Sequence, residues 1–532
     1  MKRRALLQSL AAAGSLAPFS ASAQEPQQRD PAGAPNILLL MTDQQRPDSL
    51  GCYGSKVAIT PHIDRLANQG VRFENCYVQN PLCCPSRYSM LTGRYPHSHG
   101  VRSNWYAPRP GETSFGHQLS RAGYNTALIG KMHFTPWHDL FGFGGRIIAE
   151  AKFAVNCPDD YERFLRKHGF SRRQLYDLNS AEYIRNATAV KSKLPQELHI
   201  DSFVGRSICE YLASVREPFC LMASFLSPHN PYDPPKPYDE LFLKAQFPPR
   251  NMYPGEVEEK PKEAYHYINR RLGWPHKTDQ LTPEQLQITK AYYYSTCTLV
   301  DDWVGRVMDV LKRRGLDRNT IVLYTSDHGD LLGDHGLIYK QCFYEQSVKV
   351  PLIVHAPGRF APRVVDAPVE GVDIFNTVCD LARAWPGRGR QGKRLVPLLD
   401  GRAGYIHREA VFSENHFGRM VRHGQYKMVY YPGRPYGELY DLAEDPDESR
   451  NLWSKLEGSE IKRRLKDLLL DWAFTSEDEM PLPVRADHFD EAPLEYGMVE
   501  GRTELFPRQS WYFEDLLPLY SNWEFREDGR LR

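Results

Sequence analysis

Two adjacent cysteines, Cys83 and Cys84, open the run CCPSRYSMLTGR at residues 83–94. A cysteine thiolate is a soft nucleophile that can do covalent chemistry on a substrate. The plainer interpretation is a buried pair beside a turn, because free cysteines are usually small core residues. A vicinal disulfide is another alternative, although adjacent cysteines form one only with a strained peptide. The run is therefore the first candidate for a reactive site.

Metal-ligating side chains follow two apolar runs, residues 36–41 and 320–325, which are typical of buried strands. The residues after these runs include Asp43, Gln44, Asp327 and His328. Ligands of open α/β sheets bind beyond the carboxyl ends of strands, so these side chains stand where a site is expected. Hard oxygen ligands favour Ca²⁺ or Mg²⁺. For an isolated Ser-Asp-His-Gly sequence, however, a loop with one satisfied aspartate is the better explanation.

Basic side chains follow the apolar runs 125–130 and 219–225 and the Ser-Asp-His-Gly segment. They are Lys131, His133, His229 and Lys340. Lysines can stabilise negative charge that develops on a substrate, and histidines can transfer protons. Lysines on the surface and hydrogen-bonded histidines near turns remain the alternatives for each residue taken alone.

Alternating strands and helices must position these groups. Thr60-Pro61 and Thr282-Pro283 are helix starts, with a cap followed by proline at the first helical position. The second helix reaches Arg314 and ends at Gly315. This alternation predicts a mainly parallel sheet covered on both faces. Residues 135–200 have weaker periodicity and are interpreted as a variable insertion.

A second, smaller unit is expected after the Pro/Gly/Arg-rich hinge at 386–394. Short alternating strands at 410–412, 426–431 and 438–440 precede a helix at about 458–473. We therefore expect a large α/β domain over 35–400, and a smaller antiparallel α+β domain with a tail over 401–532.

The composition is that of an ordinary globular protein. The 532 residues are 41% hydrophobic and 25% charged, with a formal net charge of +1. This balance gives no reason to expect nucleic acid or an anionic membrane as partner, so an anionic substrate would need a local cationic site. Ten cysteines are too few for a disulfide scaffold in a chain of this size.

The N-terminus resembles a targeting segment. Lys2, Arg3 and Arg4 precede an apolar run at 5–18 that is too short to span a bilayer. We expect a signal peptide over 1–23, of the twin-arginine type, with a general-secretion signal as the alternative. Residues 24–34 are expected to be a flexible spacer. The mature protein is thus expected to be periplasmic or secreted, with no membrane span.

The run at 83–94 fills every fixed position of the sulfatase signature C-x-P-S-R-x-x-x-L-T-G-R. The chain therefore resembles the formylglycine-dependent type I sulfatases of the alkaline phosphatase superfamily, a group that includes arylsulfatases, choline sulfatases and phosphonate monoester hydrolases. Other matches, in the family's order, are Asp43-Gln44, Gly130-Lys131-Met132-His133, Ser227-Pro228-His229, Ser326-Asp327-His328-Gly329 and Lys340. The resemblance covers about residues 35–455, and the segment 476–532 matches no part of it.

The resemblance implies an alkaline-phosphatase-like three-layer α/β/α domain with a large mixed sheet, plus a smaller C-terminal α+β domain with an antiparallel sheet. It also implies a formylglycine formed from Cys83 by a maturation enzyme, whose hydrate is the nucleophile. The implied metal is Ca²⁺, with Mg²⁺ or Mn²⁺ as alternatives. The implied metal ligands are Asp43, Gln44, Cys83, Asp327 and His328.

The resemblance further implies roles for the remaining residues. Lys131 and Lys340 would screen the sulfate, and Arg87 would orient the hydrated aldehyde rather than bind substrate. His229, with Lys340, would protonate the leaving alcohol. His133 would help remove the proton from the second hydroxyl, so that the aldehyde reforms and sulfate is expelled.

The implied substrate is a sulfate monoester of a small molecule or glycan. Gln44 replaces the second aspartate of many sulfatases, which admits a phosphonate monoester or phosphodiester hydrolase as the first alternative. Lys131 and His133 favour sulfate, because the phosphonate hydrolases lack that pair. A non-catalytic sulfated-glycan-binding protein is the second alternative, and a vicinal-dithiol redox protein lacks support from a C-x-x-C motif. The oligomeric state stays open.

Variable loops are expected to build the substrate pocket, at about residues 102–112, 135–200 and 230–280. The aromatic residues there would suit a sugar or aromatic ring, or would pack within the loops: Trp105, Tyr106, Trp137 and Tyr232.

Overall fold

The computed structural model describes residues 33–152, 159–176, 180–256 and 278–477. The expected signal peptide, almost all of the spacer and the tail beyond residue 477 lie outside these ranges. Among the helices in the described ranges, none is long and apolar enough to cross a membrane.

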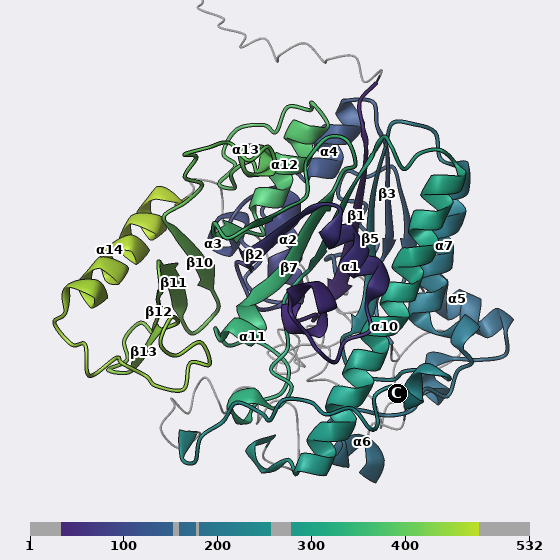
Figure 1. The fold of residues 1–532 in the computed structure, drawn as a ribbon. Coiled ribbons are helices and arrows are strands. Elements are labelled where there is room, and N and C mark those ends of the chain that lie inside the picture. The colour runs from purple at the N-terminus through teal and green to yellow at the C-terminus, as the bar shows by residue number, and fades with distance from the viewer. Residues whose placement is uncertain (1–32, 153–158, 177–179, 257–277, 478–532) are drawn as a thin grey trace, which may run out of the picture.

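A nine-stranded mixed sheet forms the centre of the molecule (Figure 1). Its order is β4-β3-β5-β1-β6-β7-β2-β8, with β9 paired to β2. The strands are β1 (Asn36–Asp43), β2 (Val71–Tyr77), β3 (Asn125–Gly130), β4 (Gly145–Ile148), β5 (Phe219–Pro228), β6 (Thr320–Ser326), β7 (Lys349–His355), β8 (Arg363–Val365) and β9 (Val369–Glu370). The neighbours from β4 to β6 are parallel, whereas β7 is antiparallel to both β6 and β2.

Helices cover both faces of the sheet, which confirms the expected three layers. One face carries α1 (Pro61–Asn68), α7 (Ile200–Ser214) and α10 (Pro283–Arg313). The other carries α2 (Cys83–Thr92), α4 (Phe115–Arg121) and α12 (Asp373–Leu381). Further helices are α3 (Pro96–His99), α5 (Asp160–Lys167), α6 (Ala181–Arg185), α11 (Glu345–Val348) and α13 (Val396–Leu399).

The continuous apolar sequence of β1 follows from this double cover. Leu38 and Leu40 pack with the α7 and α10 side, whereas Leu39 and Met41 pack with the α2 side. Successive side chains of a strand point to opposite faces, so a strand between two helix layers must be apolar at every position. Burying one such side chain is worth about 1.5–3 kcal/mol.

The predicted start of the long helix is confirmed at α10. Thr282 caps the helix, Pro283 is its first residue, and Gln285 completes a reciprocal capping box with Thr282. The helix spans 31 residues and ends one residue before the predicted Arg314.

A separate antiparallel sheet follows, with the strands β10 (Ala410–Glu414), β11 (Arg419–His423), β12 (Tyr426–Tyr430) and β13 (Gly437–Asp441) in sequence order. Helix α14 (Glu460–Thr475) packs on this sheet. In Figure 1 this unit lies beside β2, in green and yellow. Buried Arg408, which bonds to Glu370 and Asp373, ties it to the main sheet. The expected antiparallel α+β unit is thus present, and β11 is an additional strand.

The region expected to be an insertion extends the main sheet. Strand β4 pairs in parallel with β3 and forms the edge of the sheet. Its four residues are only half-buried, so neither length nor pattern marks it as a strand. The 135–200 region is therefore partly integral to the fold.

Gly130 is predicted to be indispensable to the sheet. Its φ is +93°, and a Cβ there would lie 2.0 Å from the carbonyl oxygen of Ser224 on β5. Strained backbone and the clash together should make Gly130→Ala cost at least about 3 kcal/mol of unfolding free energy in urea titrations. Gly169→Ala is the matched control, because Gly169 has φ +80° but open space around its Cβ position. That variant should lose only about 1–2 kcal/mol, and an equal loss in both would contradict the steric argument.

Candidate functional site

Four adjacent parallel strands, β3, β5, β1 and β6, bring the candidate residues to one edge of the sheet. Asp43 ends β1 and is level with Pro228, the last residue of β5. Thr42 is level with Ser326, which ends β6 just before Asp327. Lys131 and His229 directly follow β3 and β5. The order of the strands, rather than closeness in sequence, assembles the site.

Four of the five expected metal ligands form one buried group. The ligand atoms of Asp43, Cys83, Asp327 and His328 all lie within 4.8 Å of one another, and all four residues are buried. Cys83 Sγ is 3.1 Å from His328 Nε2 and 3.9 Å from Asp43 Oδ1. His328 Nε2 is also 3.7 Å from Asp327 Oδ1. This group could hold a cation.

The protonation states of this group suit a cation. Burial works against the charged form of Asp43, but the charges of Lys131 and Arg87 bring its pKa well below its usual value. Burial lowers the pKa of His328, which leaves the imidazole neutral near pH 7. Metal ligation requires a charged carboxylate and a neutral imidazole, so both side chains are already in the ligating form.

Arg87 lies directly behind the two carboxylates. Its guanidinium donates to Asp327 Oδ2 at 2.7 Å, to Asp43 Oδ2 at 3.0 Å and to Ser224 Oγ at 2.9 Å, and its side chain is fully buried. These bonds use the planar fork of arginine to fix both carboxylates relative to each other. The orienting role predicted for Arg87 would therefore act through the two carboxylates.

Lys131 and Cys84 occupy different surroundings beside Cys83. Lys131 Nζ lies 2.8 Å from Asp43 Oδ2 and 4.0 Å from Cys83 Sγ, so a buried cation faces the reactive position. Cys84 Sγ instead donates to the carbonyl of His133 at 2.8 Å. Burial raises the pKa of Cys84 well above its usual value, which keeps it an inert thiol. Cys83 and Cys84 are both free, so the vicinal disulfide is not formed.

Gln44, the fifth expected ligand, is bonded to Lys340 and Asp330. Its amide oxygen accepts from Lys340 Nζ at 2.5 Å, and its amide nitrogen donates to Asp330 Oδ2 at 2.5 Å. Tyr232 also donates to Asp330 Oδ2 through its hydroxyl. Tyr232 is thus a buried support of the site rather than a platform for a substrate ring.

Asp330 is the site residue that sequence reasoning missed. It lies three positions after Asp327 and accepts from the backbone of Leu332 and Tyr339 as well as from Gln44. These bonds close the loop that carries Lys340. Its position in the same Ser-Asp-His-Gly-Asp segment was the only available signal.

The two histidines differ in their hydrogen bonds. His229 Nδ1 lies 2.6 Å from the Asn230 carbonyl, which only a protonated Nδ1 can satisfy. His229 Nε2 then accepts from Lys340 Nζ at 2.9 Å. His133 has its backbone N–H bonded to Glu150 and its ring edge-to-face with Trp105 at 5.1 Å between centroids.

Unusual backbone conformations gather at this edge of the sheet. Gln44, Trp105 and His133 have φ values of 71°, 68° and 60°, and Tyr339 and Gln341 on either side of Lys340 have 69° and 85°. Each such non-glycine residue costs on the order of 1–3 kcal/mol and persists only when its surroundings hold it. This clustering is typical of a functional site.

Two other features of the described residues are less suited to chemistry. His62, Asp301 and Asp302 form a second group of metal-ligating types, but Asp301 already accepts from the backbone of His62 and Ile63 at the start of α1. Asp301 thus acts as a helix cap supplied by α10.

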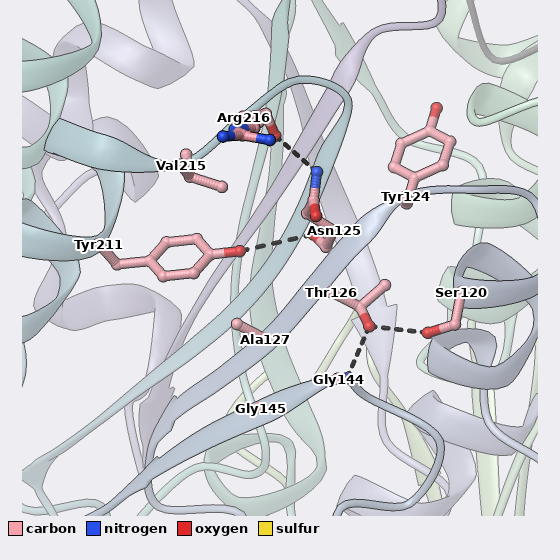
Figure 2. A pocket seen from close by; sticks show the side chains of 10 residues that line it. All are labelled: Ser120, Tyr124, Asn125, Thr126, Ala127, Gly144, Gly145, Tyr211, Val215 and Arg216. Atoms are coloured by element: carbon pink, nitrogen blue, oxygen red, sulfur yellow. Dashed lines mark hydrogen bonds between the residues drawn. The ribbon is translucent and has the colours of Figure 1, made fainter.

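A cavity of about 520 Å³ lies at the opposite, amino end of β3 (Figure 2). Its polar groups bond to one another, as in Ser120 Oγ to Thr126 Oγ1 at 2.8 Å and Asn125 Nδ2 to the Arg216 carbonyl at 3.0 Å. Lys131 follows the other end of the strand, so this cavity is separate from the candidate site.

The chain is similar to sulfatases and their relatives. Residues 35–384 match the family described as Sulfatase, and residues 333–474 match the C-terminal region of N-sulphoglucosamine sulphohydrolase. The chain is 31% identical to an arylsulfatase of Clostridium perfringens, over 82% of this chain and 94% of that protein. It is 28% identical to a choline-sulfatase of Rhizobium meliloti, over 79% and 82% of the two chains. The structure of a phosphonate monoester hydrolase of Agrobacterium radiobacter superposes with a TM-score of 0.75 at 25% identity, over 84% of this chain and 97% of that one.

Removal of one carboxylate is predicted to abolish cation binding. A cation that binds only the folded state stabilises it by about 2.7 kcal/mol at 100 times its Kd. After treatment with EDTA, the melting temperature of the wild type should rise on addition of CaCl₂, whereas that of Asp327→Asn should not. Asp301→Asn is the control, because it removes a buried aspartate outside the group and should keep the response. An equal response of Asp327→Asn and wild type would show that the cation binds elsewhere.

Proposed function

This chain belongs to the sulfatase family, and we propose that it hydrolyses a sulfate monoester to inorganic sulfate and an alcohol. Its class, a sulfuric ester hydrolase, follows from the family match and the named relatives. One observation carries the proposed mechanism: Cys83 stands at the first position of α2 among Asp43, Asp327 and His328. That is the cysteine of the family signature.

We propose that Cys83 is converted to formylglycine by a maturation enzyme, and that residue 83 binds one divalent cation together with Asp43, Asp327 and His328. The two carboxylates favour a hard cation, with Ca²⁺ ahead of Mg²⁺ or Mn²⁺. When present, the hydrated aldehyde would supply an oxygen nucleophile, and the cation would acidify it and neutralise charge on the sulfate.

Lys131 and Lys340 are proposed to bind the sulfate oxygens. Both are buried, with 5% and 2% of their surface exposed. In such surroundings a cation acts on developing negative charge far more strongly than in water. The start of α2 adds the positive end of the helix dipole at the same place.

The Lys340–His229 pair is proposed to protonate the leaving oxygen. Lys340 donates to His229 Nε2 at 2.9 Å, and His229 Nδ1 is held by the Asn230 carbonyl at 2.6 Å. A proton passing from Lys340 to Nε2 can therefore go on to the alcohol oxygen, while Nδ1 keeps its own proton. His133 is proposed to act as the base that releases the sulfate. Its backbone N–H bonds to Glu150 and its carbonyl accepts from the thiol of Cys84, the neighbour of Cys83.

A phosphonate monoester or phosphodiester hydrolase is the second candidate. The similarity to a solved phosphonate monoester hydrolase and the presence of Gln44 favour it. Lys131 and His133 form a Lys-x-His pair, and Lys131 is bonded to Asp43. This pair favours sulfate. Comparing kcat/KM on an aryl sulfate and on an aryl phosphonate monoester decides between them, and we expect the sulfate to be the better substrate.

Export is proposed on the sequence of residues 1–23 alone, which lie outside the described residues. Because Cys83 is fully buried once the chain is folded, maturation would have to precede folding, and a twin-arginine route exports proteins already folded. We therefore propose maturation in the cytoplasm and function in the periplasm.

Conversion of Cys83 is predicted to be required for turnover. In active protein, the tryptic peptide that contains residue 83 should lack an alkylatable thiol at Cys83 and keep one at Cys84. Cys83→Ala should have no measurable activity, since no other described side chain occupies that position. Fully alkylatable Cys83 in a preparation with full activity would refute the mechanism.

His229→Ala is predicted to harm poor leaving groups most. General acid catalysis is typically worth about 10²–10⁴-fold, and a nitrophenolate needs little of it. The variant should therefore lose far more kcat on an alkyl or sugar sulfate than on nitrophenyl sulfate. Equal losses on both substrates would assign His229 to binding of sulfate oxygens rather than to proton transfer.

A further inference from the structure

A buried lysine that the proposed mechanism does not use lies under the segment that carries His229. Lys152 is 2% exposed, and its ammonium donates to Ser227 Oγ at 3.1 Å, to the Pro231 carbonyl at 2.9 Å and to Asp233 Oδ1 at 2.8 Å. An ammonium has three N–H donors, so these three bonds satisfy it completely. All three acceptors belong to residues 227–233, which we name the His229 loop.

Asp201 and His199, at the start of α7, bond to the two ends of the same loop. Asp201 accepts from the backbone of Leu226 and Ser227 at 2.7 and 3.1 Å, and from Ser227 Oγ at 2.5 Å. At the other end, His199 Nε2 lies 3.3 Å from Asp233 Oδ2, which also accepts from the hydroxyl of Tyr176 at 2.5 Å. Lys152 bonds to both ends of the loop, at Ser227 and at Asp233. Together with Asp201 and His199, these bonds form a closed ring around the loop.

Lys152 and Asp233 form an ion pair in which both side chains are buried. Burial opposes ionisation of Asp233, but Lys152 and His199 lower its pKa to about 2. The carboxylate therefore stays charged at any ordinary assay pH. Removing one partner of a buried, hydrogen-bonded ion pair is costly, because the other charge is left without compensation. The loop consequently has one strongly preferred conformation.

His229 lies inside the ring, two residues after Ser227 and four before Asp233. The orientation of its ring depends on the backbone of its own loop, since Nδ1 bonds to the carbonyl of Asn230. Nε2 must meet Lys340, which approaches from a different loop at 2.9 Å. A shift of the His229 loop would separate these atoms, and misplacement by about 1 Å can cost 10²-fold in rate.

We propose that Lys152, with Asp233, His199 and Asp201, is a positioning network that holds His229 in line with Lys340 for proton transfer. The proposal rests on the general acid role given to the Lys340–His229 pair under the proposed function. Lys152 and Tyr176 come from the 135–200 region, so that region would serve the chemistry and not only the walls of the substrate pocket.

The test compares Lys152→Met and Asp233→Asn with the wild type on nitrophenyl sulfate and on an alkyl sulfate. Lys152→Met should lose about 10- to 100-fold more kcat on the alkyl sulfate than on the aryl sulfate. Lys462→Met is the matched control, because Lys462 is also 2% exposed and bonds to the Trp453 carbonyl near α14. It should lower the melting temperature without changing the ratio of the two rates.

The same substitutions in a His229→Ala background complete the test. There Lys152→Met should cause no further selective loss on the alkyl sulfate. Equal losses of Lys152→Met on both substrates, or a selective loss that persists without His229, would overturn the positioning role. If Lys152→Met does not fold, Asp233→Asn, which keeps the size of the side chain, decides in the same way.

A readout independent of activity separates this proposal from the proposed function. In crystal structures, Lys152→Met or Asp233→Asn should show His229 Nε2 moved away from Lys340 Nζ, and the Lys462→Met control should not. An unmoved His229 overturns the network. A moved His229 in an enzyme whose His229→Ala variant shows no dependence on the leaving group would instead retain the network and reject the acid role.

Discussion

The bonds of one buried guanidinium to two buried carboxylates are the interaction on which the site depends. Arg87, Asp43 and Asp327 have no exposed side-chain surface. Two carboxylates so close together would repel each other and would cost several kcal/mol each to desolvate. Arg87 and Lys131 offset their charges, so the four side chains are neutral together. A divalent cation would then leave a net positive site in a protein with a net charge of only +1, which suits an anionic ester.

The sequence predicted those strands and helices whose signals lie within a short run of residues. Apolar runs marked β1, β3, β5 and β6, and the polar residues behind them mark the edge where the site lies. The start of α10 could be predicted because Thr282, a cap residue, is followed by Pro283 at the first helical position. Strand β7 could not be predicted from an apolar run, because Pro351 interrupts the strand where its pairing with β2 shifts register.

The roles of side chains that bond to residues far away in the sequence could not be predicted. Asp330 bonds to Gln44 across 286 positions, and Lys152 bonds to Asp233 across 81. The 135–200 region is the clearest example, since buried ion pairs such as Arg172 with Asp159 organise much of it. Hydrophobic periodicity carries no signal where polar bonds hold a segment together, and so the weak pattern of this region concealed strand β4 and the buried ion pairs of its described residues.

The wide separation of the site residues along the chain also has a consequence for synthesis. Gln44 and Lys340 are 296 positions apart, and β1 needs β6 as its neighbour before either can be fully buried. Such a topology is slow to form, because long loops must close before the contacts between distant residues can stabilise the fold. A growing chain would have its cysteine run outside the ribosome long before residue 340 is made. The fold itself therefore sets a period during translation in which Cys83 is accessible, and it ends that period by completing the sheet.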